Sequence, residues 1–419
     1  MSDFEQVTGA YRAHVNRGLA LIANVTGSAA EASAQGAILK DHRGEAYLQC
    51  GGFGVLTLGH GHPKVVEAVA QQLRRLPMTG RVLLSPELAA AAEALASHTP
   101  DGLEYAFFHC SGAEAVELAI KLARANGHRR IVSMEGGFHG KTIGALSVTG
   151  RELYREPFEP LLEGVTFVPF GDADALAAAL AENEEPAAVI LEPVQSEAGV
   201  RIPSEGYLAE VERACRAAGA LLIVDEIQTG LGRLGAWWGC ERQGVTPDLM
   251  LSGKALGGGV MPVSAVVATE AAFAPLNRDV SIHSSTFAGM PLAMAAVTAT
   301  LEVMEEEGIV DRARELGPRL LEVVRSAVAD SCPHLVSDVR GDGLMLGVEL
   351  PSSTIAADLL IQLQRRHVLT SASFNAREVI RFTPPAILEE EHVEWLDRAL
   401  REAGEALASL HPEPVASVA

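Results

Sequence analysis

The chain has 419 residues, of which 48% are hydrophobic and 21% are charged. This length suits one large α/β domain with a smaller second domain. The 33 Lys and Arg residues against 54 Asp and Glu give a net charge of -21, which repels a phosphate backbone, so we expect no nucleic-acid partner. The sequence shows no apolar run of membrane-spanning length and no signal-peptide pattern at its start, so we expect no membrane association.

The five cysteines are spaced without a Cys-x-x-Cys pair, and their number is odd. Such spacing is typical of buried, reduced thiols and predicts a cytoplasmic protein without disulfides. His60 and His62 flank a glycine in a turn that is rich in Gly and Pro. A structural turn explains this pair better than a metal site, so we expect no bound metal.

The first 37 residues carry little pattern and predict a helix followed by an irregular arm. His62-Pro63 then opens a helix, because proline is favoured in the first helical turn. The apolar face of this predicted helix consists of Val65, Val69, Leu73 and Leu76.

From about residue 104, short apolar runs alternate with helical patterns. This alternation predicts a mostly parallel sheet with helices on both faces, in which the strands are buried. The predicted strands are 105–109, 131–134, 165–169, 187–191, 220–224 and 249–251.

After about residue 290 the pattern changes to one long helical stretch, 291–330, followed by two strands at 344–350 and 379–382. A last helix has a continuous apolar face, and together these elements predict a smaller α+β domain. We therefore divide the chain into an N-terminal arm with part of the small domain (1–60), a large ligand-binding domain (61–295) and a C-terminal small domain (296–419).

Four polar motifs follow predicted strands, where open α/β sheets bind their ligands. The first, Ser111-Gly112-Ala113-Glu114, has the pattern of a capping box and predicts a helix start. Its free backbone N–H groups can bind an anion, although a plain helix cap explains the motif equally well when it is taken alone.

The second motif runs from Gly136 to Thr142 and ends in Gly140-Lys141-Thr142, like a phosphate-binding P-loop. A P-loop requires glycine at position 135, which is Glu in this chain. A glycine-rich turn that exposes Phe138 is the simpler interpretation, with a P-loop nucleotide enzyme as a rival.

The third and fourth motifs are Asp225–Gly230 and Ser252–Gly259. A carboxylate at a buried strand end, such as Asp225, either binds a cation or caps the next element. Lys254 lies between a strand and a glycine-rich turn, where desolvation lowers the pKa of an amine and makes it nucleophilic.

In this order, the four motifs match the needs of pyridoxal phosphate. The phosphate needs backbone N–H donors, the ring needs an aromatic face, the pyridine nitrogen needs a carboxylate, and the aldehyde needs an amine. We therefore predict a pyridoxal-phosphate enzyme.

The sequence resembles the class III aminotransferases of the ornithine, acetylornithine and putrescine group from about residue 38 to 405, and the putrescine branch is the most similar. The resemblance implies an α/β fold of the fold-type I pyridoxal-phosphate transferases. The motifs that carry it are Gly52-Phe53-Gly54, Gly59–Pro63, Ser111–Ala115, Gly137–Gly140, Glu192–Gln195, Asp225–Gly230, Ser252–Val263, Ser285–Phe287, Arg340–Gly347 and Ile380–Pro385.

The resemblance also implies roles around the cofactor. Lys254 would form its Schiff base, Asp225 would pair with the pyridine nitrogen, and Gln228 would bond the phenolic oxygen. Phe138 would stack on the ring, with His139 beside it.

For the phosphate, the resemblance implies the N–H groups of Gly112 and Ala113. Thr286 would reach the same phosphate from a partner subunit, so the expected active unit is a homodimer with its site at the interface.

For substrates, Arg381 would bind a carboxylate, and Glu197 would be its switchable ion-pair partner. Phe53 matches one aromatic residue of an ornithine pocket, as Phe in place of Tyr. Ser196 replaces the usual Gly, and Met290 replaces the usual Asn. We expect transfer of an amino group from an ω-amino donor, such as a diamine or an ornithine-like compound, to a keto acid, with 2-oxoglutarate favoured. An aminomutase, a decarboxylase and a non-catalytic cofactor-binding module are the alternatives.

Overall fold

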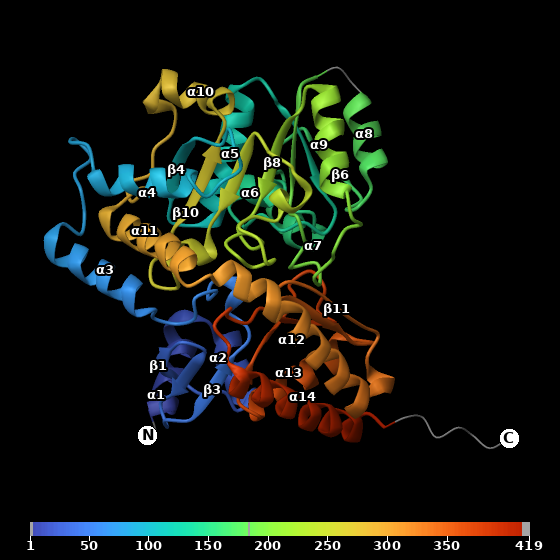
Figure 1. The fold of residues 1–419 in the computed structure, drawn as a ribbon. Helices are drawn as coiled ribbons and strands as arrows, with labels where there is room; N and C mark the ends of the chain where they lie inside the picture. Colours follow the sequence, from blue (N-terminus) through green and yellow to red (C-terminus); the bar gives the residue numbers. More distant parts are fainter. Residues whose placement is uncertain (1–2, 183–184, 413–419) are drawn as a thin grey trace.

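The computed structural model describes residues 3–182 and 185–412. Figure 1 shows two stacked parts, an upper α/β part and a lower part to which both ends of the chain contribute. Within these described ranges, no helix is long and apolar enough to cross a membrane.

The upper part is built on a seven-stranded sheet. Six strands run parallel, and β10 runs antiparallel to both of its neighbours, β4 and β9. The predicted strands all form, and the α/β fold class is confirmed. The strand order is β4 (Tyr105–His109), β10 (Ser264–Ala268), β9 (Leu249–Ser252), β8 (Leu221–Asp225), β7 (Ala187–Leu191), β5 (Arg130–Met134) and β6 (Val165–Val168).

Both faces of this sheet are covered, which explains why its strands are apolar without alternation. Along β7, Val189 packs in a core cluster on one face, whereas Ala188 and Ile190 pack in a second cluster. The helices of the upper part are α3 (Pro63–Arg75), α4 (Pro86–Ala96), α5 (Gly112–Ala125), α6 (Ile143–Ser147), α7 (Glu152–Arg155), α8 (Ala173–Ala181), α9 (Tyr207–Ala218), α10 (Glu270–Arg278) and α11 (Pro291–Glu306).

The lower part holds two four-stranded sheets. In the first, β13 from the C-terminal half pairs in parallel with β3 from the N-terminal segment, which joins the two ends of the chain. The first sheet contains β1 (Glu31–Gln35), β2 (Ile38–Asp41), β3 (Ala46–Gln49) and β13 (Val368–Leu369). The second contains β11 (Asp338–Asp342), β12 (Met345–Glu349), β15 (Val379–Phe382) and β14 (Ser371–Ala372). The domain boundaries at residues 60 and 295 stay predictions.

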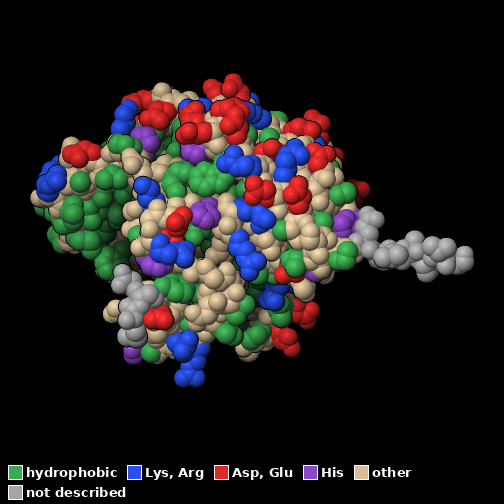
Figure 2. Space-filling model, turned by 90° about the horizontal axis from the view of Figure 1, so that it is seen from below, with side chains coloured by type: hydrophobic (Ala, Val, Ile, Leu, Met, Phe, Trp, Pro, Cys, Tyr) green, Lys and Arg blue, Asp and Glu red, His purple; other side chains and the backbone are tan. Residues whose placement is uncertain are grey.

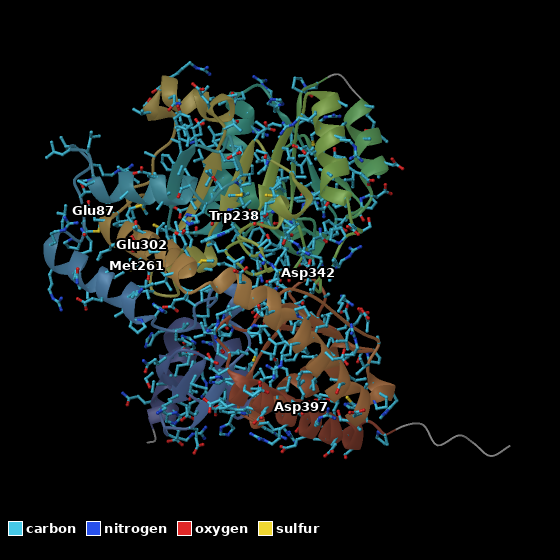
Figure 3. All side chains as sticks on the ribbon, in the orientation of Figure 1. Glu87, Trp238, Met261, Glu302, Asp342 and Asp397 are labelled. Atoms are coloured by element: carbon cyan, nitrogen blue, oxygen red, sulfur yellow. The ribbon has the colours of Figure 1, made fainter. Side chains whose placement is uncertain are left out.

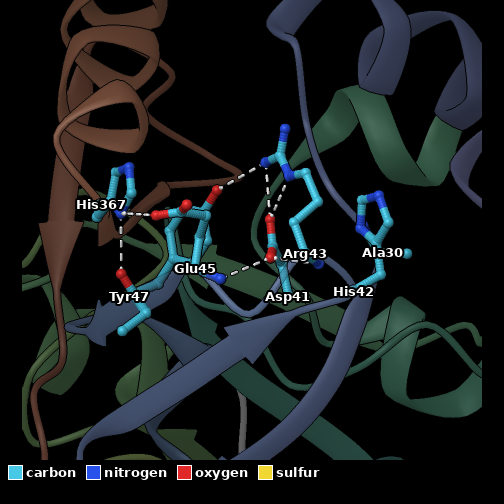
Figure 4. A network of polar contacts seen from close by, with 8 residues as sticks. Ala30, Asp41, His42, Arg43, Glu45, Tyr47 and His367 are labelled. Carbon is cyan, nitrogen blue, oxygen red and sulfur yellow. Dashed lines mark hydrogen bonds and ion pairs between the residues drawn. The ribbon is translucent and has the colours of Figure 1, made fainter.

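A polar network holds the first of these sheets to the C-terminal half (Figure 4). Asp41 accepts hydrogen bonds from the Arg43 side chain at 2.7 Å and from the Glu45 amide at 2.9 Å. The His367 ring stacks on Tyr47 with ring centroids 4.7 Å apart, and its Nδ1 lies 3.0 Å from the Ala46 carbonyl oxygen. These contacts fix the β2–β3 turn against the segment that leads into β13.

The predicted stretch 291–330 is helical, but it divides into two helices, α11 and α12 (Ile309–Ser331), because Gly308 takes a left-handed backbone with φ of 59°. The prediction for the N-terminal segment was wrong. The expected irregular arm before residue 37 is largely regular, with α1 (Asp3–Ala10), a π-helical turn (Tyr11–Val15), α2 (Arg17–Thr26) and β1. The remaining helices are α13 (Ser353–Arg365) and α14 (Glu390–Leu410).

The predicted apolar face of α3 is only half covered. Val65 is fully buried, but Leu73 and Leu76 are exposed, contrary to the prediction. The following segment exposes Val82, Leu83 and Leu84 as well. Figure 2 shows hydrophobic side chains gathered at the left end of the molecule, where α3 lies in Figure 1. This uncovered apolar area is larger than a single exposed side chain and suits contact with another molecule.

Candidate active site

A cavity of about 200 Å³ lies at the carboxyl ends of the parallel strands. Seven of the eight residues predicted from the sequence to bind the cofactor line it, and the eighth, Thr286, does not. Because they come from four separate loops, only the parallel sheet brings them together. The lining residues are Gly112, Ala113, Phe138, His139, Gly140, Glu192, Asp225, Ile227, Gln228 and Lys254.

One wall of the cavity is the N-terminus of α5. The Ser111 hydroxyl accepts a hydrogen bond from the Glu114 amide at 3.4 Å, and Glu114 accepts one from the Cys110 amide at 3.1 Å. A Cβ atom at Gly112 would lie 2.9 Å from the Ile227 side chain. Glycine therefore lets the loop after β8 approach a helix start whose N–H groups favour an anion.

Asp225 ends β8 and lies inside the cavity. Its Oδ2 is 2.7 Å from Nδ1 of His139, and its Oδ1 accepts a hydrogen bond from the Ile227 amide at 3.0 Å. Burial opposes the charged imidazole, but the hydrogen bond and charge of Asp225, with the charge of Glu192, outweigh burial and raise the pKa of His139. The carboxylate is thereby held in one orientation at the strand end.

The loop after Asp225 is fixed from outside the cavity. Trp238, labelled in Figure 3, is fully buried, and a Cβ atom at Gly230 would lie 2.6 Å from its ring. The Glu226 carboxylate accepts a hydrogen bond from the Cys240 amide at 2.7 Å. These contacts position the loop that carries Asp225 and Gln228.

Lys254 follows β9, as the sequence predicts. It is the first residue of a one-turn 3-10 helix (Lys254–Gly257) that follows Gly253, and its backbone is left-handed, with φ of 45°. Desolvation lowers the pKa of its ammonium, against the opposing charges of Asp225 and Glu197. A lowered pKa favours the neutral amine, which is the nucleophilic form.

The P-loop alternative is excluded by the contacts of the segment that suggested it. The start of α6 already binds a carboxylate, because Glu117 accepts hydrogen bonds from the Thr142 hydroxyl at 2.5 Å and from the Gly144 amide at 2.9 Å. The ammonium of Lys141 instead lies over aromatic rings, 4.2 Å from the ring centroid of Tyr154. Neither group is arranged to hold a nucleotide phosphate.

Glu192 also lines the cavity, although no role was predicted for it from the sequence. It follows β7 directly, so the strand-end signal that singles out Asp225 applies to it equally. Its Oε1 accepts a hydrogen bond from the Phe138 amide at 2.9 Å. Burial raises the pKa of Glu192 to about 7, with His139 opposing the rise and Asp225 adding to it.

We expect the substitution Glu192→Gln to remove a pH-dependent loss of stability. The carboxyl of the folded protein keeps its proton up to about pH 7, whereas that of the unfolded chain loses it near 4.5. The folded state thus binds more protons between these values, and its stability falls as pH rises through this window. Glutamine cannot ionise, so its free energy of unfolding should not fall in this window. Above about pH 7, the variant should therefore be more stable relative to the wild type than it is at low pH, by roughly 3 kcal/mol.

Urea unfolding of the cofactor-free proteins at pH 5 and pH 8, at equal protomer concentration, measures this difference. The exposed Glu152→Gln is the matched control and should show no such gain. An equal effect of Glu192→Gln at both pH values would contradict the account.

A second group of polar side chains lies beside the cavity. Arg381 on β15 is fully buried, and its Nη1 lies 2.6 Å from Oε1 of Glu197. The ring of Phe53 lies beside this cation, with 5.9 Å between the guanidinium carbon and the ring centroid, and stacks on Phe374. The structure therefore brings together the three residues predicted for substrate.

Thr286 lies apart from the others. It is exposed in the described chain and does not line the cavity. The hydroxyl of the neighbouring Ser285 donates a hydrogen bond to the Glu114 carboxylate of α5 at 3.4 Å. The carbonyl oxygen of Ser285 accepts a hydrogen bond from the Arg81 guanidinium. The loop that carries Thr286 is thus anchored near α5 with the threonine facing outward.

The cavity fits pyridoxal phosphate. It combines a helix N-terminus without a Cβ at Gly112, an aromatic side chain at Phe138, a buried carboxylate at Asp225 and a desolvated amine at Lys254. Each satisfies one chemical need of that cofactor. Within the described ranges, no group of His, Cys, Asp and Glu side chains is arranged to hold a metal ion.

The model of the family "Aminotransferase class-III" matches residues 24–403. The chain belongs to this family. Class III aminotransferases depend on pyridoxal phosphate, and this aminotransferase shares that cofactor. The predicted enzyme class and cofactor are confirmed.

Solved structures agree with this assignment. An ornithine aminotransferase from Toxoplasma gondii ME49 is 29% identical with a TM-score of 0.90, over 98% of this chain and 97% of that chain. A second structure of the Toxoplasma gondii ornithine aminotransferase, described as having partial occupancy of PLP at its active site, is 28% identical with a TM-score of 0.86, over 98% and 99%. An (S)-enantioselective omega-transaminase from Thermomicrobium roseum is 27% identical with a TM-score of 0.88, over 96% and 98%. This aminotransferase therefore resembles both groups over nearly its whole length.

Proposed function

We propose that this aminotransferase takes the amino group from an ω-amino donor and passes it to 2-oxoglutarate. The observation that carries the proposal is the buried ion pair between Arg381 and Glu197. Ornithine aminotransferases and an omega-transaminase among the similar structures support a donor that reacts at a terminal amine.

The ion pair explains how one site can accept two kinds of substrate. A buried guanidinium without an anion is unstable, and Glu197 supplies that anion when the donor's reacting end carries no carboxylate. Oε2 of Glu197 also accepts a hydrogen bond from the Phe374 amide at 3.0 Å, which holds the closed arrangement. When a keto acid binds, its carboxylate takes the place of Glu197 on Arg381, in the geometry that guanidinium groups favour.

The cavity residues carry out the chemistry. Pyridoxal phosphate, when bound, supplies the ring that accepts electrons from the substrate. We assign Lys254 as the amine that holds the cofactor and then moves the proton at the reacting carbon. We assign Asp225 to keep the pyridine nitrogen protonated and Gln228 to donate to the phenolic oxygen.

Lys141 narrows the choice of donor. Its ammonium lies within 6.0 Å of the ring centroid of Phe138, which lines the cavity, and 5.1 Å from that of Phe374. A cation there attracts a carboxylate and repels a second ammonium. An ornithine-like donor with a distant carboxylate therefore fits better than a diamine, although the sequence resembles the putrescine branch.

A screen of donors against 2-oxoglutarate tests the proposal. The donors are ornithine, lysine, 4-aminobutyrate, a diamine and ordinary α-amino acids, with glutamate formation as the readout. We expect ω-amino donors to form glutamate faster than α-amino acids do. Preference for an α-amino acid would refute it, and product without glutamate would favour the aminomutase or decarboxylase alternative.

Arg381→Ala should separate the two half-reactions. Because Arg381 contacts the acceptor's carboxylate but not a carboxylate-free diamine, the 2-oxoglutarate half-reaction should slow roughly 100-fold or more and the diamine half-reaction far less. Glu197→Gln should leave Arg381 exposed and improve α-amino acids as donors. Single-turnover absorbance of each half-reaction measures both effects.

Arg130→Ala is the matched control, since Arg130 is buried but bonds carbonyl oxygens of Ala179 and Leu180 away from the site. It should affect both half-reactions alike. Equal losses for Arg381→Ala, or no gain of α-amino donors for Glu197→Gln, would refute the switch.

We also propose a homodimer in which Thr286 reaches the partner's cofactor phosphate. The apolar residues of α3 and of the segment after it are exposed, and so is Phe287 beside Thr286. These exposed residues support a surface that a second subunit covers. Exposed apolar areas of this kind are typical of subunit interfaces.

Thr286→Ala should weaken cofactor binding about tenfold, the effect of one hydrogen bond to a charged group. Cofactor titration by absorbance measures the affinity, and sedimentation velocity measures the assembly. Ser281→Ala, in the same exposed segment, is the control. A fully active monomer would contradict the proposal.

A further inference from the structure

Ser196 lies between the cofactor side and the substrate side of the site. It is fully buried, and its Oγ lies 2.8 Å from Nε2 of Gln228 and 2.8 Å from Nη1 of Arg381. Both partners are N–H donors, so the hydroxyl oxygen accepts two hydrogen bonds with its two lone pairs. One oxygen atom therefore links the two side chains.

We propose that Ser196 is a positioning residue that holds Arg381 in place for the acceptor's carboxylate while it orients the Gln228 amide. This inference rests on the proposed function, because it assumes that Glu197 leaves Arg381 when a keto acid binds. It assigns a role to a position where the sequence resemblance implies glycine, which has no hydroxyl.

The contacts of the guanidinium support this role. Nη1 has two hydrogens, and it contacts both Ser196 and Glu197. When Glu197 withdraws, the bond to Ser196 remains and keeps the guanidinium from following the departing carboxylate. Nε and Nη2 of Arg381 are buried without a partner among the described residues, so they are available as further donors to the carboxylate that replaces Glu197 on Nη1.

The contact with Gln228 extends the effect to the cofactor. An amide can present either its oxygen or its nitrogen to a neighbour, and only the nitrogen can donate. Since Ser196 accepts from Nε2, it holds the amide nitrogen of Gln228 on the side of Arg381. Loss of the hydroxyl frees both side chains at once.

The test uses the holoenzyme and glutarate, an unreactive five-carbon dicarboxylate, with binding followed by the cofactor's absorbance. Ser196→Ala should weaken glutarate binding roughly tenfold or more, since it removes a hydrogen bond to a charged group. The KM for 2-oxoglutarate should rise by a similar factor, whereas the KM for a diamine should stay within about twofold of the wild-type value. The absorbance of the bound cofactor should also shift, because Gln228 loses the hydrogen bond that orients its amide.

Ser196→Thr keeps the hydroxyl and should restore most of the glutarate affinity. Ser133→Ala is the matched control, because Ser133 is fully buried and its hydroxyl donates to the Val148 carbonyl at 2.6 Å away from the site. It should leave glutarate binding unchanged.

Two failures are distinguishable. If the wild type binds glutarate and Ser196→Ala binds it equally well, or raises both KM values equally, the role of Ser196 is refuted and the proposed function stands. If the wild type itself does not bind glutarate, the proposed dicarboxylate acceptor is refuted, and the role of Ser196 is refuted with it.

Discussion

Lys254→Ala should abolish turnover and the covalent attachment of the cofactor together. Lys254 is the amine on the cavity wall whose pKa is lowered by desolvation, and alanine can neither hold the cofactor nor move a proton. The lost proton transfer alone should lower activity by roughly 10²–10⁴-fold, and the lost covalent attachment of the cofactor should lower it further.

Reduction with borohydride followed by mass spectrometry measures the attachment. The wild type should carry one cofactor per chain on Lys254, and the variant none. Lys141→Ala is the matched control, because it removes another lysine beside the site and should keep the adduct. A reducible adduct at full stoichiometry in Lys254→Ala would contradict the assignment.

Asp225→Asn should keep much of the cofactor but lose turnover by roughly 10²–10³-fold, the usual effect of removing one preorganised electrostatic group. The amide can still accept the hydrogen bond from His139, so the local geometry survives. It carries no charge, however, and cannot hold the proton of a pyridine nitrogen.

Single-turnover rates and cofactor absorbance separate these two effects. Asp248→Asn is the control, since Asp248 bonds Arg216 and the Leu222 amide outside the cavity. Near-normal turnover in Asp225→Asn would contradict the role assigned to Asp225.

The sequence predicted the sheet and most of the cavity because both depend on local signals. Each predicted strand is a buried apolar run, and Asp225 and Lys254 follow such runs directly. The parallel arrangement then brings strand ends together, so residues far apart in the chain share one cavity.

Other features depend on contacts that the local pattern does not contain. Strand β10 is as apolar as its neighbours but was not predicted. It directly follows the glycine-rich motif of Lys254, so the local pattern did not mark it as a separate strand. The role of Ser196 depends on Arg381, 185 residues away, and becomes visible only when both side chains are placed. Leu73 has the spacing of a core residue but is exposed, because periodicity predicts an apolar face and not what covers it.

The most direct test of the central claim is to ask which nitrogen is transferred. Ornithine and lysine, each labelled with ¹⁵N at the terminal amine, are incubated with 2-oxoglutarate and the wild-type enzyme, and the glutamate formed is analysed by mass spectrometry. Our account predicts ¹⁵N-labelled glutamate, because the closed Arg381–Glu197 pair favours reaction at the end without a carboxylate. Unlabelled glutamate would show that the α-amino group is transferred and would contradict the account.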